Sequence, residues 1–260
     1  MNTHLVSPSR SFWLGSVALL VCASISAYGQ SFNGNAATGF GGAIGGSTLT
    51  VTENGLNFDF SLTTGTAFNA NALILYIDSI PGGVDSTTTL TDTADGGRTA
   101  ISGLNTGNPS RTVATFAAGF GADFAVTLEP GVFSGTFDLS NPANFGFVQG
   151  NGLVGAGTGP FTFSIARSSL GLVEGQGFSF VGTLISTSAY RSNETIGTSL
   201  TVPGSVGDTP NAGFNGTTTF AESLQVTAVP EPSTAAYLIA FGMALLIGRG
   251  LVRRRSAIQG

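Results

Sequence analysis

The sequence predicts an all-β protein, an antiparallel β-sandwich of the jelly-roll type that lies between two targeting segments. Short segments alternate apolar with polar residues at a period of two, which places one face of a strand in a core and the other in water. Glycine, asparagine and proline separate these segments, and 39 glycines in 260 residues disfavour long helices. We therefore expect about nine short strands in a domain that spans residues 30–228.

Five segments show the alternation clearly and are expected to be strands. They are residues 49–51, 56–62, 124–128, 161–165 and 178–184. Residues 72–77 form a continuous apolar run, which is typical of a central strand that is covered on both faces. The last two strands are expected at residues 200–202 and 217–227, paired across a polar loop.

Turn residues separate these strands. Asn54-Gly55 lies between two alternating segments and predicts a hairpin with a type I′ turn, because Asn-Gly readily adopts positive φ. Pro81 and the two glycines after it end the central strand. Residues 86–103 are rich in threonine and aspartate and interrupt the strand pattern, so a short helix or an excursion is expected there.

The N-terminus has the layout of a secretory signal peptide. His4 and Arg10 precede an apolar stretch at residues 12–23, and small residues follow it up to Gly29. We expect residues 1–29 to be removed by a cut after Gly29. The alternatives are a buried N-terminal helix or a permanent anchor, but the apolar stretch is short for a membrane span.

The C-terminus, residues 229–260, combines a proline motif, an apolar run and a basic end. A helix over residues 234–252 would be about 28 Å long, which is close to the thickness of a bilayer core. The basic cluster would then stay in the cytoplasm by the positive-inside rule, and the domain would lie outside. The motif is Val229, Pro230, Glu231, Pro232 and Ser233, and the cluster is Arg253, Arg254 and Arg255.

These three parts in this order resemble a PEP-CTERM sorting signal, which is found on exported proteins of Gram-negative bacteria that make exopolysaccharide. The resemblance covers Val229 to Gln259. It implies that an exosortase, a membrane-embedded cysteine transpeptidase-like enzyme, recognises Pro230, Glu231 and Pro232 and removes the tail during sorting to the surface. The precursor would be anchored in the inner membrane, and the product would reach the cell surface or extracellular matrix. The alternative is an ordinary C-terminal anchor with a proline-containing stalk.

Charge excludes nucleic acid as a partner. The chain has nine arginines, no lysine and fourteen acidic residues, which give a net charge of −5. Residues 30–228 hold thirteen of the acids and four arginines, so the exported part is near −9 (4 minus 13). Such a chain presents no basic surface to a phosphate backbone.

The chemical inventory of residues 30–228 argues against catalysis. The single His and single Cys of the chain lie before residue 30, so nucleophilic triads and zinc sites are excluded. Paired carboxylates would still suffice for a glycosidase, and the candidates beside predicted strands are Asp59, Asp78, Asp123 and Glu129. Acidic residues at such positions are more often turn or solvent-facing residues, so we expect no enzymatic activity.

A calcium site is a further hypothesis. Calcium prefers several hard oxygen ligands from loop carboxylates and carbonyls, although no EF-hand spacing is present. The four aspartates that cluster in sequence after the central strand are Asp78, Asp85, Asp92 and Asp95. Ordinary turn chemistry is the alternative for aspartates in such loops.

Residues 72–83 and 120–126 are similar to strands of the carbohydrate-binding-like sandwich domains found on some bacterial amylopullulanases and glucodextranases. This resemblance implies a glycan-facing β-sandwich. The only tryptophan, Trp13, lies in the signal segment, so no aromatic platform can be assigned. Two functions therefore stay open: a structural or adhesive protein of the envelope or exopolysaccharide biofilm, and a module that binds an exopolysaccharide.

Overall fold

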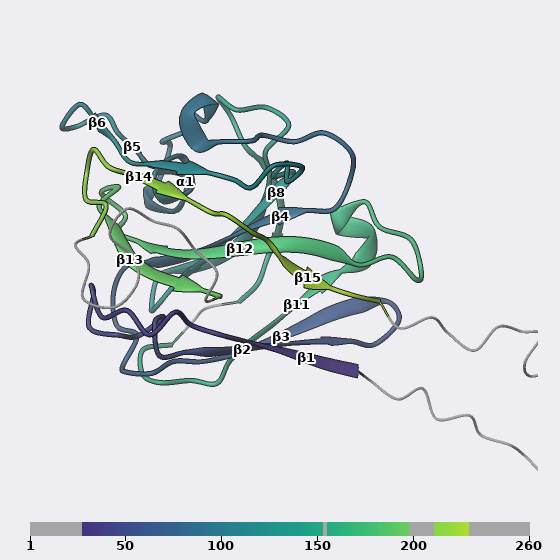
Figure 1. Cartoon of the computed structure of the whole chain (residues 1–260). Helices are drawn as coiled ribbons and strands as arrows, with labels where there is room; N and C mark the ends of the chain where they lie inside the picture. Colours follow the sequence, from purple (N-terminus) through teal and green to yellow (C-terminus); the bar gives the residue numbers. More distant parts are fainter. Residues whose placement is uncertain (1–27, 153–154, 198–210, 229–260) are drawn as a thin grey trace, which may run out of the picture.

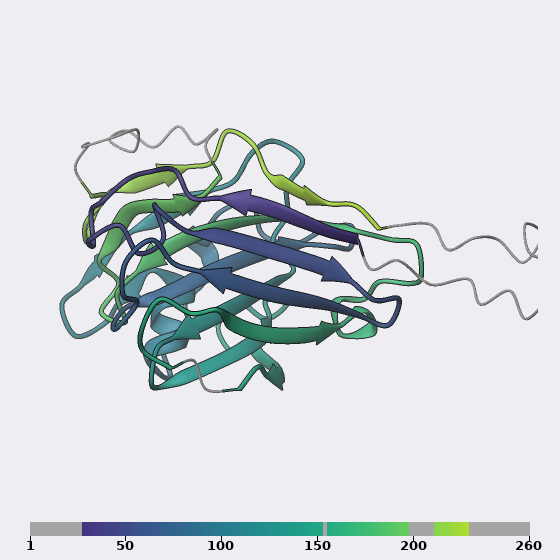
Figure 2. The same ribbon diagram turned by 90° about the horizontal axis from the view of Figure 1, so that it is seen from below.

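The computed structural model describes residues 28–152, 155–197 and 211–228. Most of the strand residues belong to two antiparallel sheets that lie one above the other (Figures 1 and 2). The smaller sheet has the order β1 (Tyr28–Asn33), β2 (Thr48–Glu53), β3 (Asn57–Thr63), β11 (Phe161–Ala166). The larger sheet has the order β10 (Gly146–Gly150), β9 (Phe133–Asp138), β8 (Phe124–Glu129), β4 (Ala72–Asp78), β12 (Phe178–Ile185), β13 (Arg191–Ile196), with β15 (Leu224–Val226) also paired to β12.

Short elements cover the outer face of the larger sheet. They are η1 (Thr87–Thr89), α1 (Gly96–Ser102), the antiparallel pair β5 (Leu104–Asn105) and β6 (Ser110–Arg111), and the parallel pair β7 (Val113–Thr115) and β14 (Thr217–Thr219). A further 3₁₀ turn, η2 (Arg167–Leu170), follows β11. The prediction of an all-β, antiparallel class is confirmed, whereas the finer assignment as a jelly-roll sandwich stays a prediction.

The main hydrophobic core lies between the two sheets. Every second residue of β2 and β3 is buried, as the alternation predicts, and these side chains meet alternate residues of β4, β8 and β12. Aromatic contacts join the sheets directly: the Phe58 and Phe178 rings meet edge to face at 4.9 Å, and the Phe32 and Phe180 rings at 5.0 Å. These interlocked rings hold the two sheets together.

A second core explains the unbroken apolar run of β4. Ala72, Ile74 and Tyr76 point away from the first core into a cluster that α1, β7 and Phe220 complete. The prediction of a central strand covered on both faces is therefore confirmed. The predicted short helix within residues 86–103 is also confirmed, because η1 and α1 lie there. Asp95 caps the N-terminus of α1, and Gly103, with φ of 64°, caps its C-terminus.

Two predictions about local structure need correction. The hairpin after β2 forms, but its loop has three residues, Asn54, Gly55 and Leu56. A type I′ turn needs positive φ at both central residues, whereas here only Gly55 has positive φ (86°), so the turn is not type I′. The predicted strand at 217–227 is two strands, β14 and β15, with different partners. The chain divides because Phe220 is buried in the outer core and Val226 in the main core.

Several strands carry no clear alternation and were not predicted. In the two main sheets they are β1, β9, β10 and β13, and outside these sheets they are β5, β6 and β7. β13 is buried at all six positions although most of its residues are polar or charged, so its sequence resembles a loop. The predicted strand at residues 200–202 lies outside the described residues.

The two ends of the described domain lie side by side (Figures 1 and 2). The Gln30 side chain donates to the Thr227 carbonyl at 2.9 Å and accepts from the Thr227 backbone N–H at 3.2 Å. Residues 1–27 of the predicted signal peptide and the predicted membrane helix at residues 234–252 fall outside the described residues, whereas Tyr28 and Gly29 begin β1. Within the part of the chain that is described, no helix is long and apolar enough to cross a membrane.

Candidate functional site: the end of the domain that leads into the C-terminal segment

The site is built around β15, the last strand before the C-terminal segment. β15 is only three residues long and pairs with the first half of β12, with Val226 opposite Phe178 and Leu224 opposite Phe180. Val226 is buried, and the Gln225 amide donates to the Ser179 hydroxyl at 2.6 Å. These contacts, together with the hydrogen bonds between the Gln30 side chain and the Thr227 backbone, fix the chain up to Thr227.

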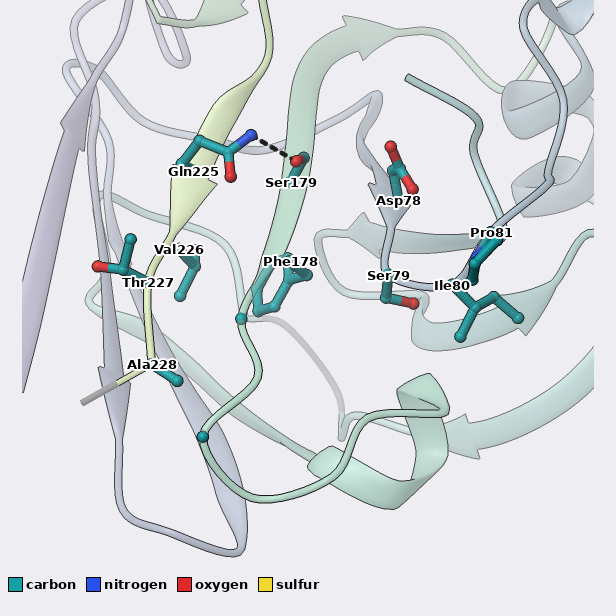
Figure 3. Close-up of a pocket in the computed structure, with 12 residues that line it drawn as sticks. Asp78, Ser79, Ile80, Pro81, Phe178, Ser179, Gln225, Val226, Thr227 and Ala228 are labelled. Carbon is teal, nitrogen blue, oxygen red and sulfur yellow. Dashed lines mark hydrogen bonds between the residues drawn. The ribbon is translucent and has the colours of Figure 1, made fainter. Parts of the chain in front are cut away.

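An open hollow of about 570 Å³ lies beside β15. Figure 3 shows the residues after β4 on one side of it and the residues of β15 on the other, with Phe178 and Ser179 between them. Backbone and small polar groups form much of the lining, and the last described residue, Ala228, belongs to it. The hollow therefore reaches the point where the chain continues into residue 229.

Two carboxylates brace the loop after β4 at this end. Asp123 accepts hydrogen bonds from the backbone N–H groups of Ser79 (2.9 Å) and Ile80 (3.0 Å), while Asp78 accepts one from Gly121 (3.3 Å). Burial raises the pKa of Asp123, against the lowering effect of these two bonds, and the neighbouring charge of Asp78 raises it further. Burial also raises the pKa of Asp78. Both groups act here as acceptors that order a turn.

Arg167 ties two further loops together at the same end. Its guanidinium pairs with Glu53 and lies 4.8 Å from the centre of the Phe58 ring. It also donates to the carbonyls of Gly55 (3.0 Å) and Val173 (3.1 Å). A nearly buried arginine with these partners makes the loop between β2 and β3 and the loop before β12 one rigid unit.

The predicted sorting residues continue directly from this site. Val229, Pro230, Glu231, Pro232 and Ser233 follow Ala228 in the chain, and Arg253, Arg254 and Arg255 lie near its end. All of them fall outside the described residues. The motif thus starts three residues after Val226, the last residue of β15.

The four aspartates of the calcium hypothesis are not gathered in one place. Asp92 and Asp95 both pair with Arg98, and Asp92 also accepts from the Phe145 backbone N–H at 2.8 Å. Asp78 belongs to the turn described above, and Asp85 is exposed. No group of three or more His, Cys, Asp or Glu side chains in the described ranges is placed to hold a metal ion. The geometry therefore gives the calcium hypothesis no support.

The candidate carboxylates for glycoside hydrolysis are also dispersed among structural roles. Asp59 accepts from the Asn54 amide and the Ser164 hydroxyl, each at 2.6 Å, on the outer side of the smaller sheet. Glu129 ends β8, and burial together with the charge of Asp95 raises its pKa. Only Asp78 and Asp123 are neighbours, and they brace the turn after β4.

Sequence reasoning missed a polar and aromatic cluster at the opposite end of the domain. The Phe40 ring stacks on Tyr190 at 5.8 Å, and Phe214 meets Tyr190 edge to face at 4.8 Å. The Asn193 side chain accepts from the Gly39 N–H at 2.9 Å beside them. Phe40 lies 150 residues before Tyr190 in the sequence, and only the fold brings the three rings together. No local sequence pattern could therefore have revealed the cluster.

The comparisons with known proteins identify the C-terminal segment. Residues 228–256 match the family described as the PEP-CTERM protein-sorting motif. No curated protein and no solved structure matches the chain, so the likeness of the domain to carbohydrate-binding-like sandwiches stays a prediction. The match begins at Ala228, where the described fold ends, and it agrees with the sequence prediction for this segment. The chain therefore carries a PEP-CTERM sorting motif and is a PEP-CTERM domain-containing protein.

Proposed function

We propose that this chain is an exported protein whose folded domain has a structural or adhesive role in the cell envelope or in an exopolysaccharide biofilm matrix, after sorting by an exosortase. The observation that carries this proposal is the sorting motif at residues 228–256, which follows a compact acidic β domain without an intervening linker. In this proposal residues 1–29 are the signal peptide and residues 234–252 form a transient membrane anchor. The two sheets with one shared core are assigned to the β-sandwich class.

A non-catalytic role is part of the proposal. Several carboxylates of the described domain already hold backbone or side-chain donors: Asp59, Asp92, Asp123 and Glu194. A general acid or nucleophile needs an oxygen that is open to substrate. Incubation of the purified domain with a panel of polysaccharides should release no reducing ends. Release that is lost on Asp123→Asn would contradict this part of the proposal.

Deletion of residues 230–232 tests the sorting step. We expect the deleted protein to keep its tail and to accumulate in the inner membrane, because the recognition residues are gone while the predicted anchor is intact. A matched control removes residues 256–258, which lie beyond the arginine cluster. Normal processing and surface display of the protein that lacks residues 230–232 would show that the segment is an ordinary stalk and anchor.

Glycan binding is the second candidate, and the aromatic cluster of Phe40, Tyr190 and Phe214 favours it. Sugar rings pack on aromatic faces, and all three of these aromatic residues are partly exposed. The cluster lies at the end of the domain away from the sorting motif, which would leave it free to meet the matrix. Calorimetric titration with the organism's own exopolysaccharide should give saturable binding that Tyr190→Ala abolishes. No saturable binding would leave the structural role alone.

A further inference from the structure

Three large apolar side chains are exposed at the end of the domain where the chain leaves. Leu56 in the loop between β2 and β3 is 79% exposed, Val173 in the loop before β12 is 64% exposed, and Ile80 after β4 is 39% exposed. Isolated exposed apolar residues are common on protein surfaces. A contiguous set of exposed apolar side chains, in contrast, marks an interaction surface.

The structure does hold these loops together. Arg167 donates to the carbonyls of Gly55 and Val173, and its own backbone N–H donates to the Leu56 carbonyl at 2.9 Å. The Ser79 hydroxyl donates to the Leu170 carbonyl at 2.8 Å, which joins the loop of Ile80 to the same frame. Leu56, Ile80 and Val173 therefore form a fixed set, which we name the apolar rim.

The apolar rim is continuous with the exit of the chain. Ile80 lines the same hollow as Thr227 and Ala228 (Figure 3). The predicted membrane helix begins at residue 234, six residues after Ala228. Six extended residues reach at most roughly 20 Å. As long as the tail is present, this end of the domain can only lie close to the bilayer.

We propose that the apolar rim rests in the surface of the bilayer while the sorting segment anchors the precursor. This inference rests on the proposed function, because it takes residues 234–252 as the anchor. The partner is the uncharged apolar part of the lipid interface. All four arginines among the described residues are buried or half-buried, and the neighbouring Asp78 and Glu174 are acidic, so anionic headgroups give no added attraction.

The proposal gives the rim a role in processing. A domain that lies on the bilayer by three points has a fixed orientation, which presents residues 229–233 along the membrane surface. An enzyme embedded in the same membrane would meet the motif in one orientation. Removal of the tail would leave only three apolar contacts, which hold a domain on a bilayer weakly, so the product would be released.

The test places tryptophan probes on residues 30–260, the precursor after removal of the proposed signal peptide. Trp13 is the only tryptophan of the chain and lies before residue 30, so each introduced tryptophan is unique. Leu56→Trp and Val173→Trp report on the rim, and Val132→Trp is the matched control, because Val132 is 59% exposed in the hairpin at the opposite end. Each protein is inserted into phosphatidylcholine vesicles that carry bromine on their acyl chains, and tryptophan emission is recorded.

We expect a blue shift and loss of emission for the probes at positions 56 and 173, and unchanged emission for the probe at position 132. Replacing a third of the lipid by phosphatidylglycerol should not increase the loss. Equal emission at all three positions would overturn the proposal. Emission at position 56 that lipid leaves unchanged, but that added exosortase alters, would overturn it in favour of contact with the enzyme.

Vesicle flotation separates this inference from the proposed function. A precursor of residues 30–260 that does not float with vesicles contradicts both the membrane-anchored precursor and the rim. A chain that floats but shows no quenching at positions 56 and 173 contradicts the rim alone. Both probes sit at exposed positions, so the variants are expected to fold, and thermal unfolding of each checks this.

Discussion

The buried carboxylate of Glu194 offers a strong test of how the end of the domain away from the sorting motif is stabilised. Glu194 lies on β13 with no exposed surface. One of its oxygens accepts from the backbone N–H groups of Phe40 (2.5 Å) and Gly42 (3.0 Å), and the other from those of Ile44 (2.8 Å) and Gly45 (3.0 Å). A single side chain thereby satisfies four donors of a loop that is rich in glycine and has little regular structure of its own.

Glu194→Gln keeps the shape of the side chain and removes half of its acceptors. The amide oxygen can still accept two bonds, whereas the amide NH₂ faces two backbone N–H groups that it cannot satisfy. A hydrogen bond to a charged group contributes about 1.5–3 kcal/mol, so two lost bonds amount to roughly 3–6 kcal/mol. For a domain of this size we expect a fall in the melting temperature on the order of 10 °C.

The assay is urea unfolding and calorimetry of residues 30–228, with Glu174→Gln as the control. Glu174 is exposed, so its substitution should change the free energy of unfolding by less than about 0.5 kcal/mol. If Glu194→Gln is as stable as the control, the carboxylate does not organise the loop at residues 39–45 and the argument from its four donors fails.

Two further substitutions test the end beside the sorting motif. Burial raises the pKa of Asp123 above its usual 3.8, so the stability that this group contributes is present below pH 3.8 and is lost as pH rises through the raised value. Asp123→Asn should therefore flatten the decline in melting temperature above pH 4, whereas the exposed Asp85→Asn should leave it unchanged, and identical pH profiles would refute the assignment. Gly177→Ala would place a Cβ 1.9 Å from the Val226 carbonyl oxygen and should detach β15, which limited proteolysis near residue 226 would detect. Gly155→Ala, which meets no atom within 4 Å, is its control, and equal cleavage of the two proteins would contradict the tight packing.

Much of the fold follows from side-chain alternation. β2, β3, β11 and most of β12 each have one face in the main core, so a period of two is visible in their sequences. β4 lies between two cores, and its unbroken apolar run indicates this directly. These strands are predictable because the burial of each residue is decided by its own sheet face.

The unpredicted parts depend on distant partners. β13 is buried with Asn193 and Glu194 in its middle, and these residues are tolerated there because backbone N–H groups of residues 39–45 provide their partners. No local sequence pattern predicts that the Glu194 carboxylate accepts hydrogen bonds from four backbone N–H groups of a loop about 150 residues earlier. The positions of Asp92 and Asp95 could not be predicted either. They are near Asp78 in the sequence, but in the structure they pair with Arg98.

The C-terminal sorting segment, in contrast, could be predicted from the sequence alone. Its proline motif, apolar run and arginine cluster are contiguous, so the sequence alone predicts the sorting motif that the family match confirms. The apolar rim could not be predicted, because Leu56, Ile80 and Val173 come from three separate loops. Only the fold shows that these loops are joined at the end of the domain where the tail leaves.

The most direct measurement of the central claim is the intact mass of the protein recovered from the cell surface or matrix. Processing by an exosortase predicts a product that begins near residue 30 and ends within or just after residues 229–233. Its mass would lack the apolar segment and Arg253, Arg254 and Arg255. A surface form that retains these residues to the C-terminus would contradict sorting by removal of the tail and would identify the segment as a permanent anchor.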